Sequence, residues 1–486
     1  MTSADQNADG NANAATTGTT EDTDLYGYPE LTLGDGTRVT RGPKPLGSGG
    51  QGSVWELNER ADLAAKIYDR APDAARQRRL VAMLRADPLA RETLAPGQPP
   101  MLVWPVVLIQ AGELPIGYGM PYLDPAAHTS LSGLLQKKGR LRRFEGRADW
   151  RFLLTVASNL AYMTAELHQQ GFVVGDLSSA NAVVDRKGYV TFLDCDSFSF
   201  TDSQTGEFFG CEVLTDDYAS PERQRGEEPT RQSDDFALAV LVYQLLTCGN
   251  HPFDGTPRYG ETEAIRKENI LAGLSFLVVP DQVQVPARLL PPEVLPPRLL
   301  ELARRTFGPG LGDPRRRPSS AAWLEALDEA RGEVASCDTV PEHRYGRHLA
   351  ACPWCARRGA GQPDPFVATA GGPGTASWGP DSPSAGASAG ASGGASAAAS
   401  GGASVSPSVP AGPSASVKPS VSVPAGSSVP AGSPGGATER SGAGSREVKP
   451  LTRGDIAFAG AALVILLGLV AAAVWGVIAL AHVIWP

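Results

Sequence analysis

Three polar residues in the middle of the chain have the types and the spacing that phosphate chemistry with a metal ion requires. Asp176 and Asn181 lie in G-D-L-S-S-A-N, and Asp194 follows thirteen residues later in V-T-F-L-D-C-D-S-F. A carboxylate such as that of Asp176 can orient a hydroxyl nucleophile, while the side-chain oxygens of the other two are ligands that Mg2+ accepts. The pattern therefore favours phosphoryl transfer from Mg-ATP.

A glycine-rich segment and a single lysine precede these residues. The segment G-S-G-G-Q-G contains Gly47, Gly49 and Gly52, is followed by Val54, and lies on a predicted hairpin. Lys66 is the one lysine in the apolar stretch A-A-K-I-Y, which is also predicted to be a strand. A dinucleotide-binding fold would place a helix directly after the glycines, so the strands favour a different nucleotide site. Taken alone, the glycines could serve a tight turn, and Lys66 could be a strand lysine with a solvated head.

In this order the motifs resemble those of the eukaryotic-type Ser/Thr protein kinases of bacteria, over about residues 40–330. The resemblance implies an α+β fold with a two-lobed protein-kinase-like domain at residues 25–330. Its β-rich N-lobe would span residues 25–122 and its mainly helical C-lobe residues 123–330. ATP would lie between the two lobes.

The resemblance also assigns roles to the site residues. Asp176 would be the catalytic carboxylate that orients the attacking hydroxyl, and Lys66 would contact the α- and β-phosphates. Asn181 and Asp194 would hold Mg2+. The remaining ATP-binding residues would come from the glycine-rich loop and the connection between the lobes, namely Gly47, Gly49, Gly52, Val54, Pro121 and Leu123.

The adenine contacts are expected in I-G-Y-G-M-P-Y-L-D, which looks like the strand that leads into the connection between the lobes. The family holds adenine with one backbone C=O and, two residues later, one backbone N–H. With Met120 as the gatekeeper, Pro121 would accept through its C=O and Leu123 would donate its N–H. The alternative is an ordinary transition from a strand to a turn.

Two further segments are similar to kinase motifs with structural roles. A-S-P-E, which ends at Glu222, is similar to the segment that closes the activation segment, and D-P-R-R-R-P-S to a late motif whose arginine pairs with that glutamate. Among the three arginines, Arg317 is assigned to Glu222. A buried helix is predicted to open at Asp234, whose carboxylate would hold the catalytic loop by backbone hydrogen bonds.

Two motifs depart from the family pattern. The usual H-R-D reads V-G-D at Val174–Asp176, and the missing arginine is the one that normally pairs with a phosphorylated activation loop. Activation is therefore expected not to depend on that switch. The usual D-F-G reads D-C-D, in which Asp196 adds negative charge beside the metal ligand Asp194. A subfamily of bacterial kinase-like proteins carries this D-x-D-S-F form.

A third departure concerns the helix that should supply a glutamate to pair with Lys66. The stretch Asp73–Arg85 has a helical pattern but contains no glutamate, so only Asp73, Gln77 or the later Glu92 is available. The stretch is also strongly basic from Arg76 to Arg85, and it is interpreted as a solvated helix face. The missing glutamate leaves open a pseudokinase, an ATP-binding scaffold with little or no catalysis. A kinase of small molecules is disfavoured by A-S-P-E and the late arginine.

Composition limits the possible partners. The chain has 486 residues, a length that allows two or three domains. Its net charge of −9 argues against general nucleic-acid binding. Residues 1–24 contain no apolar run, so they are predicted to be disordered and not to form a signal peptide. Three cysteines, Cys195, Cys211 and Cys248, are interpreted as small core or loop residues without disulfides.

The other three cysteines follow the kinase-like region within residues 331–360. Cys337, His343, Cys352 and Cys355 form C-x5-H-x8-C-x2-C, a donor set that suits one structural Zn2+. The segment is too short to build a core, so the metal would stabilise its fold. His348 is a competing ligand, and a C-P-W-C redox pair or unliganded residues remain alternatives. The same Cys–His–C-P-W-C tail follows kinase domains of the D-x-D-S-F subfamily, which also implies a zinc-knuckle-like module.

The last part of the chain is predicted to be a linker and a membrane anchor. Residues 361–450 are rich in Ser, Ala, Gly and Pro and are typical of a flexible, disordered tether. Within residues 451–486, the run Ile456–Ile484 is apolar and long enough for a single transmembrane helix. Basic residues precede the run and none follows, which predicts that the N-terminal kinase-like domain is cytoplasmic. Three glycines near one face of this helix would allow a homodimer; they are Gly460, Gly468 and Gly476.

The sequence therefore predicts a Ser/Thr protein kinase, anchored to the inner face of the cell membrane, that transfers the ATP γ-phosphate to a protein hydroxyl. Its cofactors would be ATP, Mg2+ and a structural Zn2+. Its partners would be protein substrates and the membrane, with no nucleic acid.

Overall fold

The computed structural model describes residues 30–368, apart from residues 87, 90–91, 93 and 260–264. The predicted N-terminal segment 1–24, nearly all of the linker and the apolar run Ile456–Ile484 lie outside these residues. Within the described range, no helix combines the length and the apolar character that crossing a membrane requires.

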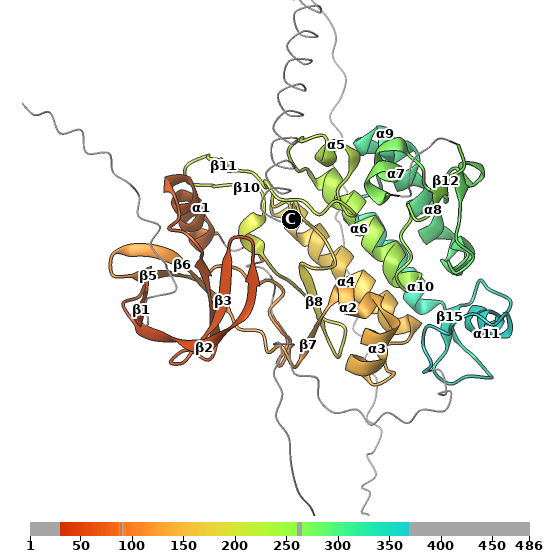
Figure 1. Cartoon of the computed structure of the whole chain (residues 1–486), viewed down its shortest axis with the longest axis horizontal. Coiled ribbons are helices and arrows are strands. Elements are labelled where there is room, and N and C mark those ends of the chain that lie inside the picture. Colours follow the sequence, from red (N-terminus) through yellow and green to blue (C-terminus); the bar gives the residue numbers. More distant parts are fainter. Residues whose placement is uncertain (1–29, 87, 90–91, 93, 260–264, 369–486) are drawn as a thin grey trace, which may run out of the picture. The chain divides into compact units, whose positions relative to one another are not determined.

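A closed six-stranded barrel forms the N-terminal part of the structure (Figure 1). The strands follow the order β1-β2-β3-β4-β6-β5, and β1 pairs with β5 to close the barrel. All neighbouring pairs are antiparallel, which short hairpins can connect. The strands are β1 (Glu30–Leu33), β2 (Arg38–Gly49), β3 (Gly52–Leu57), β4 (Leu63–Tyr68), β5 (Val107–Ala111) and β6 (Leu114–Pro121).

Alternating apolar side chains fill the barrel. Leu31 and Leu33 of β1 point inward together with Ile67 of β4 and Ile109 of β5, and all four are almost fully buried. Because this core fixes the register of the strands, it also fixes where β4 presents its side chains on the opposite face. Lys66, the neighbour of Ile67, therefore points out of the barrel core.

Helix α1 (Ala74–Arg85) follows the barrel strand β4, as the sequence predicts. The carboxylate of Asp73 caps its first turn by accepting a hydrogen bond from the Arg76 N–H, 2.8 Å away. At the other end, the indole of Trp104 donates to the carbonyls of Met83 and Ala86, at 3.0 and 3.1 Å. Both ends of α1 are thereby fixed to neighbouring parts of the chain.

The C-terminal part of the domain is mainly helical. The long helix α4 packs against α6 and α10, and every residue of α6 from Ser233 to Leu246 is buried. The sequence predicted that this buried helix opens at Asp234, but it begins at Arg231 because Thr230 and Ser233 form a capping box. The helices are α2 (Leu131–Leu135), α3 (Lys137–Phe144), α4 (Trp150–Gln169), α5 (Pro221–Gln224), α6 (Arg231–Leu246), α7 (Arg266–Ala272), α8 (Pro297–Phe307), α9 (Pro309–Gly312) and α10 (Ser320–Gly332).

Small strands and short helices carry the loops between the two parts. The three-stranded sheet β7-β8-β9 lies next to the loop of Asp176, and the hairpin β10-β11 follows Asp194. The strands are β7 (His128–Ser130), β8 (Ala182–Asp185), β9 (Val190–Phe192), β10 (Phe200–Thr201), β11 (Phe208–Phe209), β12 (Thr256–Pro257) and β13 (Val283–Gln284). The 3-10 helices are η2 (Cys195–Ser197), η3 (Pro280–Gln282), η4 (Pro292–Val294) and η5 (Pro314–Arg316). This two-lobed arrangement confirms the predicted α+β kinase-like domain, while the predicted transmembrane helix falls outside the described residues.

A small module follows α10 and packs against the helical lobe. It contains the hairpin β14 (Val334–Ser336) and β15 (Arg344–Gly346), then helix α11 (Pro353–Gly359). The buried ring of Trp354 packs edge-on against Phe366, with ring centroids 4.9 Å apart. The buried guanidinium of Arg140 in α3 donates to the carbonyl of Pro365, so the kinase-like lobe holds the module directly.

Candidate active site

A cavity of about 620 Å³ lies between the barrel and the helical lobe. It is bounded above by β2, β3, β4 and β6 and below by the loops that flank β8 and β9. The structure brings together in its walls all ten residues that the sequence assigned to ATP, Mg2+ and the attacking hydroxyl. They are Gly47, Gly49, Gly52, Val54, Lys66, Pro121, Leu123, Asp176, Asn181 and Asp194.

The glycine-rich loop joins β2 to β3 over the cavity. None of its glycines has a positive φ, so the chain conformation does not demand them. A Cβ on Gly47 or Gly50 would meet no protein atom within 4 Å, so packing does not demand these two either. Gly52 differs, since its Cβ would overlap the carbonyl of Ile67 in β4. Bare backbone facing an open cavity is what close approach of phosphate oxygens requires.

Asp176 and Asn181 are joined within the loop that precedes β8. The amide of Asn181 donates to Oδ2 and to the backbone carbonyl of Asp176, at 2.9 and 3.1 Å. The amide nitrogen is therefore used within the loop, which leaves the amide oxygen as the atom available to a cation. Oδ1 of Asp176 is buried and has no hydrogen-bond partner among the described residues. A buried oxygen without a partner is costly, so it fits a donor from a bound substrate.

Asp194 follows β9 in a left-handed conformation, with φ of 56°. Its side chain is 54% exposed and faces the cavity. This residue, Asn181 and Asp176 present only oxygen atoms to the same space, which is the donor set that Mg2+ prefers. The residues present therefore fit Mg-ATP.

Lys66 reaches two carboxylates across the cavity. Its Nζ lies 2.5 Å from Oδ1 of Asp194 and 2.8 Å from Oδ1 of Asp196. Burial lowers the pKa of this ammonium, but the charges of Asp196 and Asp194 outweigh burial and raise the pKa above its ordinary value. Lys66 is therefore charged at neutral pH.

The sequence offered three partners for Lys66, and in the described part of the chain none of them is hydrogen-bonded to its ammonium. Asp73 caps helix α1, and the Gln77 amide donates to the carbonyl of Pro72 at 2.8 Å. Burial and then the nearby carboxylate of Glu92 raise the pKa of the Tyr162 hydroxyl. These assignments are wrong because each side chain is occupied locally, while Asp196 reaches the ammonium from the other lobe. The extra carboxylate of D-C-D was the signal that could have identified it.

The predicted solvated face of helix α1 is also wrong for Arg79 and Arg85. Arg79 donates to the carbonyls of Phe198 and of Gly210, the latter at 2.8 Å. Arg85 donates to the buried carboxylate of Asp202 at 2.7 Å. The basic side of α1 is thus docked on the segment that follows Asp196, and Figure 1 shows α1 beside the β10-β11 hairpin.

The catalytic loop is held by Asp234, as the sequence predicted. Its carboxylate accepts hydrogen bonds from the N–H groups of Val174 and Gly175, at 2.7 and 2.9 Å. The imidazole of His168 lies 3.0 Å from the same carboxylate. Two backbone bonds directly before Asp176 fix the position of its side chain.

Glu222 and Arg317 form the predicted pair in the helical lobe. Both guanidinium nitrogens donate to the two carboxylate oxygens, one of them at 2.8 Å. Burial raises the pKa of Glu222, but the hydrogen bonds and charge of Arg317 outweigh burial and lower the pKa. The pair ties the end of the activation segment to the loop before α10.

The connection between the lobes begins at Met120, whose side chain is buried at the cavity. The N–H of Tyr122 donates to the carbonyl of Asp62 at 2.9 Å. The N–H of Leu123, by contrast, has no acceptor among the described residues and lies in the cavity wall. The N–H group predicted to contact adenine is therefore free to donate to a ligand.

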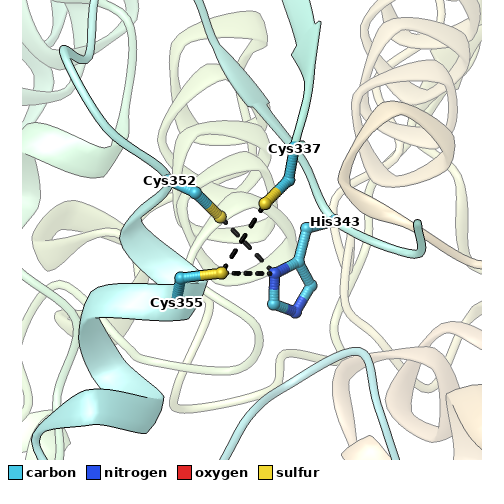
Figure 2. A group of neighbouring side chains, drawn as sticks. All are labelled: Cys337, His343, Cys352 and Cys355. Atoms are coloured by element: carbon cyan, nitrogen blue, oxygen red, sulfur yellow. Dashed lines mark hydrogen bonds between the residues drawn. The ribbon is translucent and has the colours of Figure 1, made fainter. Parts of the chain in front are cut away.

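The four predicted zinc ligands converge in the C-terminal module, as Figure 2 shows. The donor atoms of Cys337, His343, Cys352 and Cys355 all lie within 4.8 Å of one another. The Sγ atoms of Cys337 and Cys355 are 3.6 Å apart, and Nδ1 of His343 lies 3.4 Å from Sγ of Cys352. Donors about 2.0–2.3 Å from a tetrahedral ion would have separations of this size.

The surroundings of the cluster exclude His348 as one of its ligands. His348 points elsewhere, with Nε2 3.1 Å from the carbonyl of Glu293, so it is not the competing ligand. Cys352 and Cys355 form no disulfide, since all six cysteines are free. The sequence missed Asp364, whose Oδ2 accepts from Nε2 of His343 at 2.9 Å. That bond directs Nδ1 toward the thiols, a second partner that metal-bound histidines commonly have.

Comparisons with known proteins agree with this geometry. Residues 122–324 match the family model described as "Protein kinase domain". The chain is 31% identical over 340 residues to "Protein kinase YegI" of Escherichia coli O157:H7, which covers 68% of this chain and 50% of that protein. It is 24% identical over 301 residues to "Serine/threonine-protein kinase PknD" of Chlamydia caviae, covering 58% of this chain and 30% of that protein.

A third relative, "Serine/threonine-protein kinases PknA" of Corynebacterium glutamicum, is 28% identical over 144 residues, which covers 27% of this chain and 29% of that protein. The chain spans half or less of the length of these relatives. The family match and the two-lobed fold show that this chain contains a protein kinase domain, distantly homologous to bacterial protein kinases.

Proposed function

We propose that this chain is an active Ser/Thr protein kinase that transfers the ATP γ-phosphate to a hydroxyl of a protein substrate. The observation that carries the proposal is the convergence of Lys66, Asp176, Asn181 and Asp194 on one cavity, in which Oδ1 of Asp176 has no partner among residues of the described ranges. The names of the relatives PknD and PknA support the choice of serine and threonine as acceptors.

Each side chain has one task in the proposed mechanism. Oδ1 of Asp176 accepts a hydrogen bond from the substrate hydroxyl and aims its oxygen at the γ-phosphorus, later taking up the proton. Asn181 and Asp194 would hold Mg2+, which neutralises charge on the phosphates when bound. Lys66 binds the α- and β-phosphates. Positioning and charge neutralisation would therefore account for most of the rate gain.

A pseudokinase is the second candidate, and one contact favours it. The Lys66 ammonium lies against the metal ligand Asp194 at 2.5 Å, an arrangement that would compete with Mg2+. Asp196 weakens this argument because it offers Lys66 a second carboxylate when Asp194 turns to the metal. We therefore favour the active enzyme.

Phosphate transfer from [γ-32P]ATP distinguishes the two candidates. The full chain should label itself or a generic protein substrate on serine or threonine, and Asp176→Asn and Asp194→Ala should each abolish labelling. Asp281→Asn, which changes an exposed aspartate in η3, is the matched control and should label normally. Mg-ATP binding by the wild-type chain without any labelling would instead establish the scaffold.

We also propose that the chain is anchored to the membrane with this domain in the cytoplasm. The apolar run Ile456–Ile484 and the basic residues before it support this placement. The full chain should sediment with membranes and resist extraction by high salt, whereas a chain ending at residue 450 should be soluble. Equal distribution of the two forms would contradict the anchor.

Finally, we propose that the Cys3His cluster binds one structural Zn2+. Four protein donors leave no open position for substrate, so the ion would stabilise the module rather than take part in phosphoryl transfer.

A further inference from the structure

We propose that Asp196 is the positioning residue for Lys66 in this kinase and replaces the helix glutamate that the sequence lacks. Helix α1, which has no glutamate for Lys66, instead supplies arginines that hold the segment carrying Asp196. The inference deepens the proposed function, because it rests on Lys66 binding the phosphates.

The two carboxylates that contact Lys66 differ in their access to solvent. The side chain of Asp194 is 54% exposed at the cavity, whereas that of Asp196 is only 6% exposed. Asp194 is therefore free to turn to a cation, while Asp196 is enclosed with the ammonium. A buried carboxylate needs a charged partner to offset its lost hydration, and Lys66 is that partner.

A second side chain of β4 lies beside Asp196. Burial and then the charge of the Asp196 carboxylate raise the pKa of the hydroxyl of Tyr68, two residues after Lys66 on β4. Lys66 and Tyr68 lie on the same face of the strand, because side chains alternate along β4. Asp196 thus lies against this face of β4, and its contact with Lys66 at 2.8 Å places the ammonium at a defined position over the cavity.

Helix α1 holds the backbone beside Asp196 through Arg79. This guanidinium donates to the carbonyl of Phe198, two residues beyond Asp196, and to that of Gly210 at 2.8 Å. It also lies over the rings of Phe200 and Phe209, at 5.9 and 6.0 Å from their centroids. One half-buried arginine therefore ties both strands of the β10-β11 hairpin to α1.

Two further ion pairs complete this docking. Arg78 lies 3.0 Å from the carboxylate of Glu207, and Arg85 lies 2.7 Å from that of Asp202. Both acids belong to the hairpin region that follows Asp196. The basic composition of α1 is thus explained by the acidic, carbonyl-rich segment on which it lies.

The arrangement has a consequence for regulation. Where a helix carries the carboxylate, movement of that helix makes or breaks the lysine pair. Here the carboxylate of Asp196 lies on the same short segment as the metal ligand Asp194. The position of that segment therefore determines both the lysine pair and the metal site. Arg79 holds that segment without a phosphate group, which agrees with the absence of an arginine before Asp176.

A double-mutant cycle between Lys66 and Asp196 tests the inference. The Kd for Mg-ATP, which needs no turnover, and the kcat/KM for ATP are measured for the wild type, Asp196→Asn, Lys66→Met and the double variant. Asp196→Asn keeps the shape and removes the charge, and it should weaken both quantities by about 10- to 100-fold. In the Lys66→Met background the same change should alter the Kd less than about twofold, because its partner is already gone.

The cycle separates three outcomes. An equal loss from Asp196→Asn in both backgrounds, or no loss in the wild type, overturns the inference. If Lys66→Met itself changes neither quantity, the phosphate role of Lys66 in the proposed function fails instead. Asp281→Asn, the exposed control, should behave as the wild type in both assays.

A milder variant covers the case in which Asp196→Asn does not fold. Tyr68→Phe removes the hydroxyl that lies beside Asp196 and leaves the ring and the charges in place. It should lower kcat/KM for ATP by about 3- to 10-fold in the wild type and leave the Kd of the Lys66→Met chain unchanged. If Tyr68→Phe weakens Mg-ATP binding equally in the wild type and in the Lys66→Met chain, the result would contradict the positioning role of Asp196.

Discussion

Asp364 accepts a hydrogen bond from Nε2 of His343 at 2.9 Å, while Nδ1 of the same ring faces the thiols of Cys352 and Cys355. The bond makes Nε2 the protonated nitrogen and leaves the lone pair of Nδ1 for a ligand. Asp364 itself is held by the N–H groups of Phe366 and Val367. The segment after α11 thereby prepares the ring for metal binding.

The purified full chain should contain one Zn2+ per molecule. Asp364→Asn should weaken zinc affinity by about 10- to 100-fold, since the ring loses its orienting acceptor. Competition with a chelator, followed by metal analysis, measures this affinity. His348→Ala, which changes a histidine outside the cluster, should bind zinc normally. A chain purified without zinc that gains none on titration would refute the site.

The pair of Glu222 and Arg317 should be important for stability. Their side chains are 9% and 0% exposed, so removing one leaves the other as a buried, uncompensated charge. Glu222→Ala should lower the free energy of unfolding by about 3–5 kcal/mol, measured by urea denaturation. Arg298→Ala removes exposed pairs with Glu325 and Glu329 and should cost less than about 1 kcal/mol. Equal losses in the two variants would show that burial does not determine the effect.

His251 should make the helical lobe sensitive to acid. Its Nε2–H donates to the carbonyl of Asp217 at 2.8 Å, and Nδ1 accepts from the N–H of Phe253 at 3.2 Å. Burial, followed by the charge of Arg266, lowers the pKa of the imidazole to about 4. Protonation would place a hydrogen on Nδ1, where the Phe253 N–H already points.

The direction of the pH effect on stability follows from the protonation of His251 in the folded and the unfolded chain. Between about pH 6.5 and pH 4 the unfolded chain binds a proton at His251 that the folded chain does not. Stability should therefore fall as pH falls through this window, by up to about 1.4 kcal/mol per pH unit from this residue. Urea unfolding at pH 7, 5.5 and 4.5 measures the slope. His251→Gln cannot be protonated and should show a shallower slope than the wild type. Parallel slopes would exclude His251 as the cause.

Much of the active site could be predicted because its motifs are local in sequence. Asp176 and Asn181 are hydrogen-bonded within one loop, and that loop enters β8 directly. The glycines border two strands of one hairpin, so their spacing alone places them over the cavity. Such patterns depend on contacts a few residues apart, which the sequence displays directly.

The contacts that the sequence did not predict join distant segments. Asp196 reaches Lys66 from 130 residues away, and Arg79 reaches Gly210 from 131 residues away. The helical pattern of α1 shows that one face is basic, but it does not show what covers that face. The covering β10-β11 hairpin is placed there by the packing of the helical lobe, which is distant in sequence. Asp364 escapes prediction for a related reason, since it lies in the stretch 361–450 whose composition predicts a linker.

Gly175 should not tolerate a side chain, although the family pattern has an arginine there. Its φ is 78°, and an added Cβ would lie 2.7 Å from Cβ of Cys211. Its N–H is also bonded to Asp234, so the loop cannot move away without losing that bond. Gly175→Ala and Gly175→Arg should therefore displace Asp176, lower kinase activity by more than about tenfold and reduce stability by about 1–3 kcal/mol.

Gly171→Ala is the matched control for this prediction. Gly171 has φ of 86°, but a Cβ there would meet no atom within 4 Å, so the substitution adds backbone strain without the contact. It should reduce the melting temperature slightly and preserve kinase activity, since it lies before the bonds that fix Asp176. An active, normally stable Gly175→Arg chain would contradict the prediction. An inactive or unstable Gly175→Arg chain would show that this single substitution cannot recreate the usual H-R-D motif. Cys211 and the left-handed backbone at position 175 leave no room for the arginine.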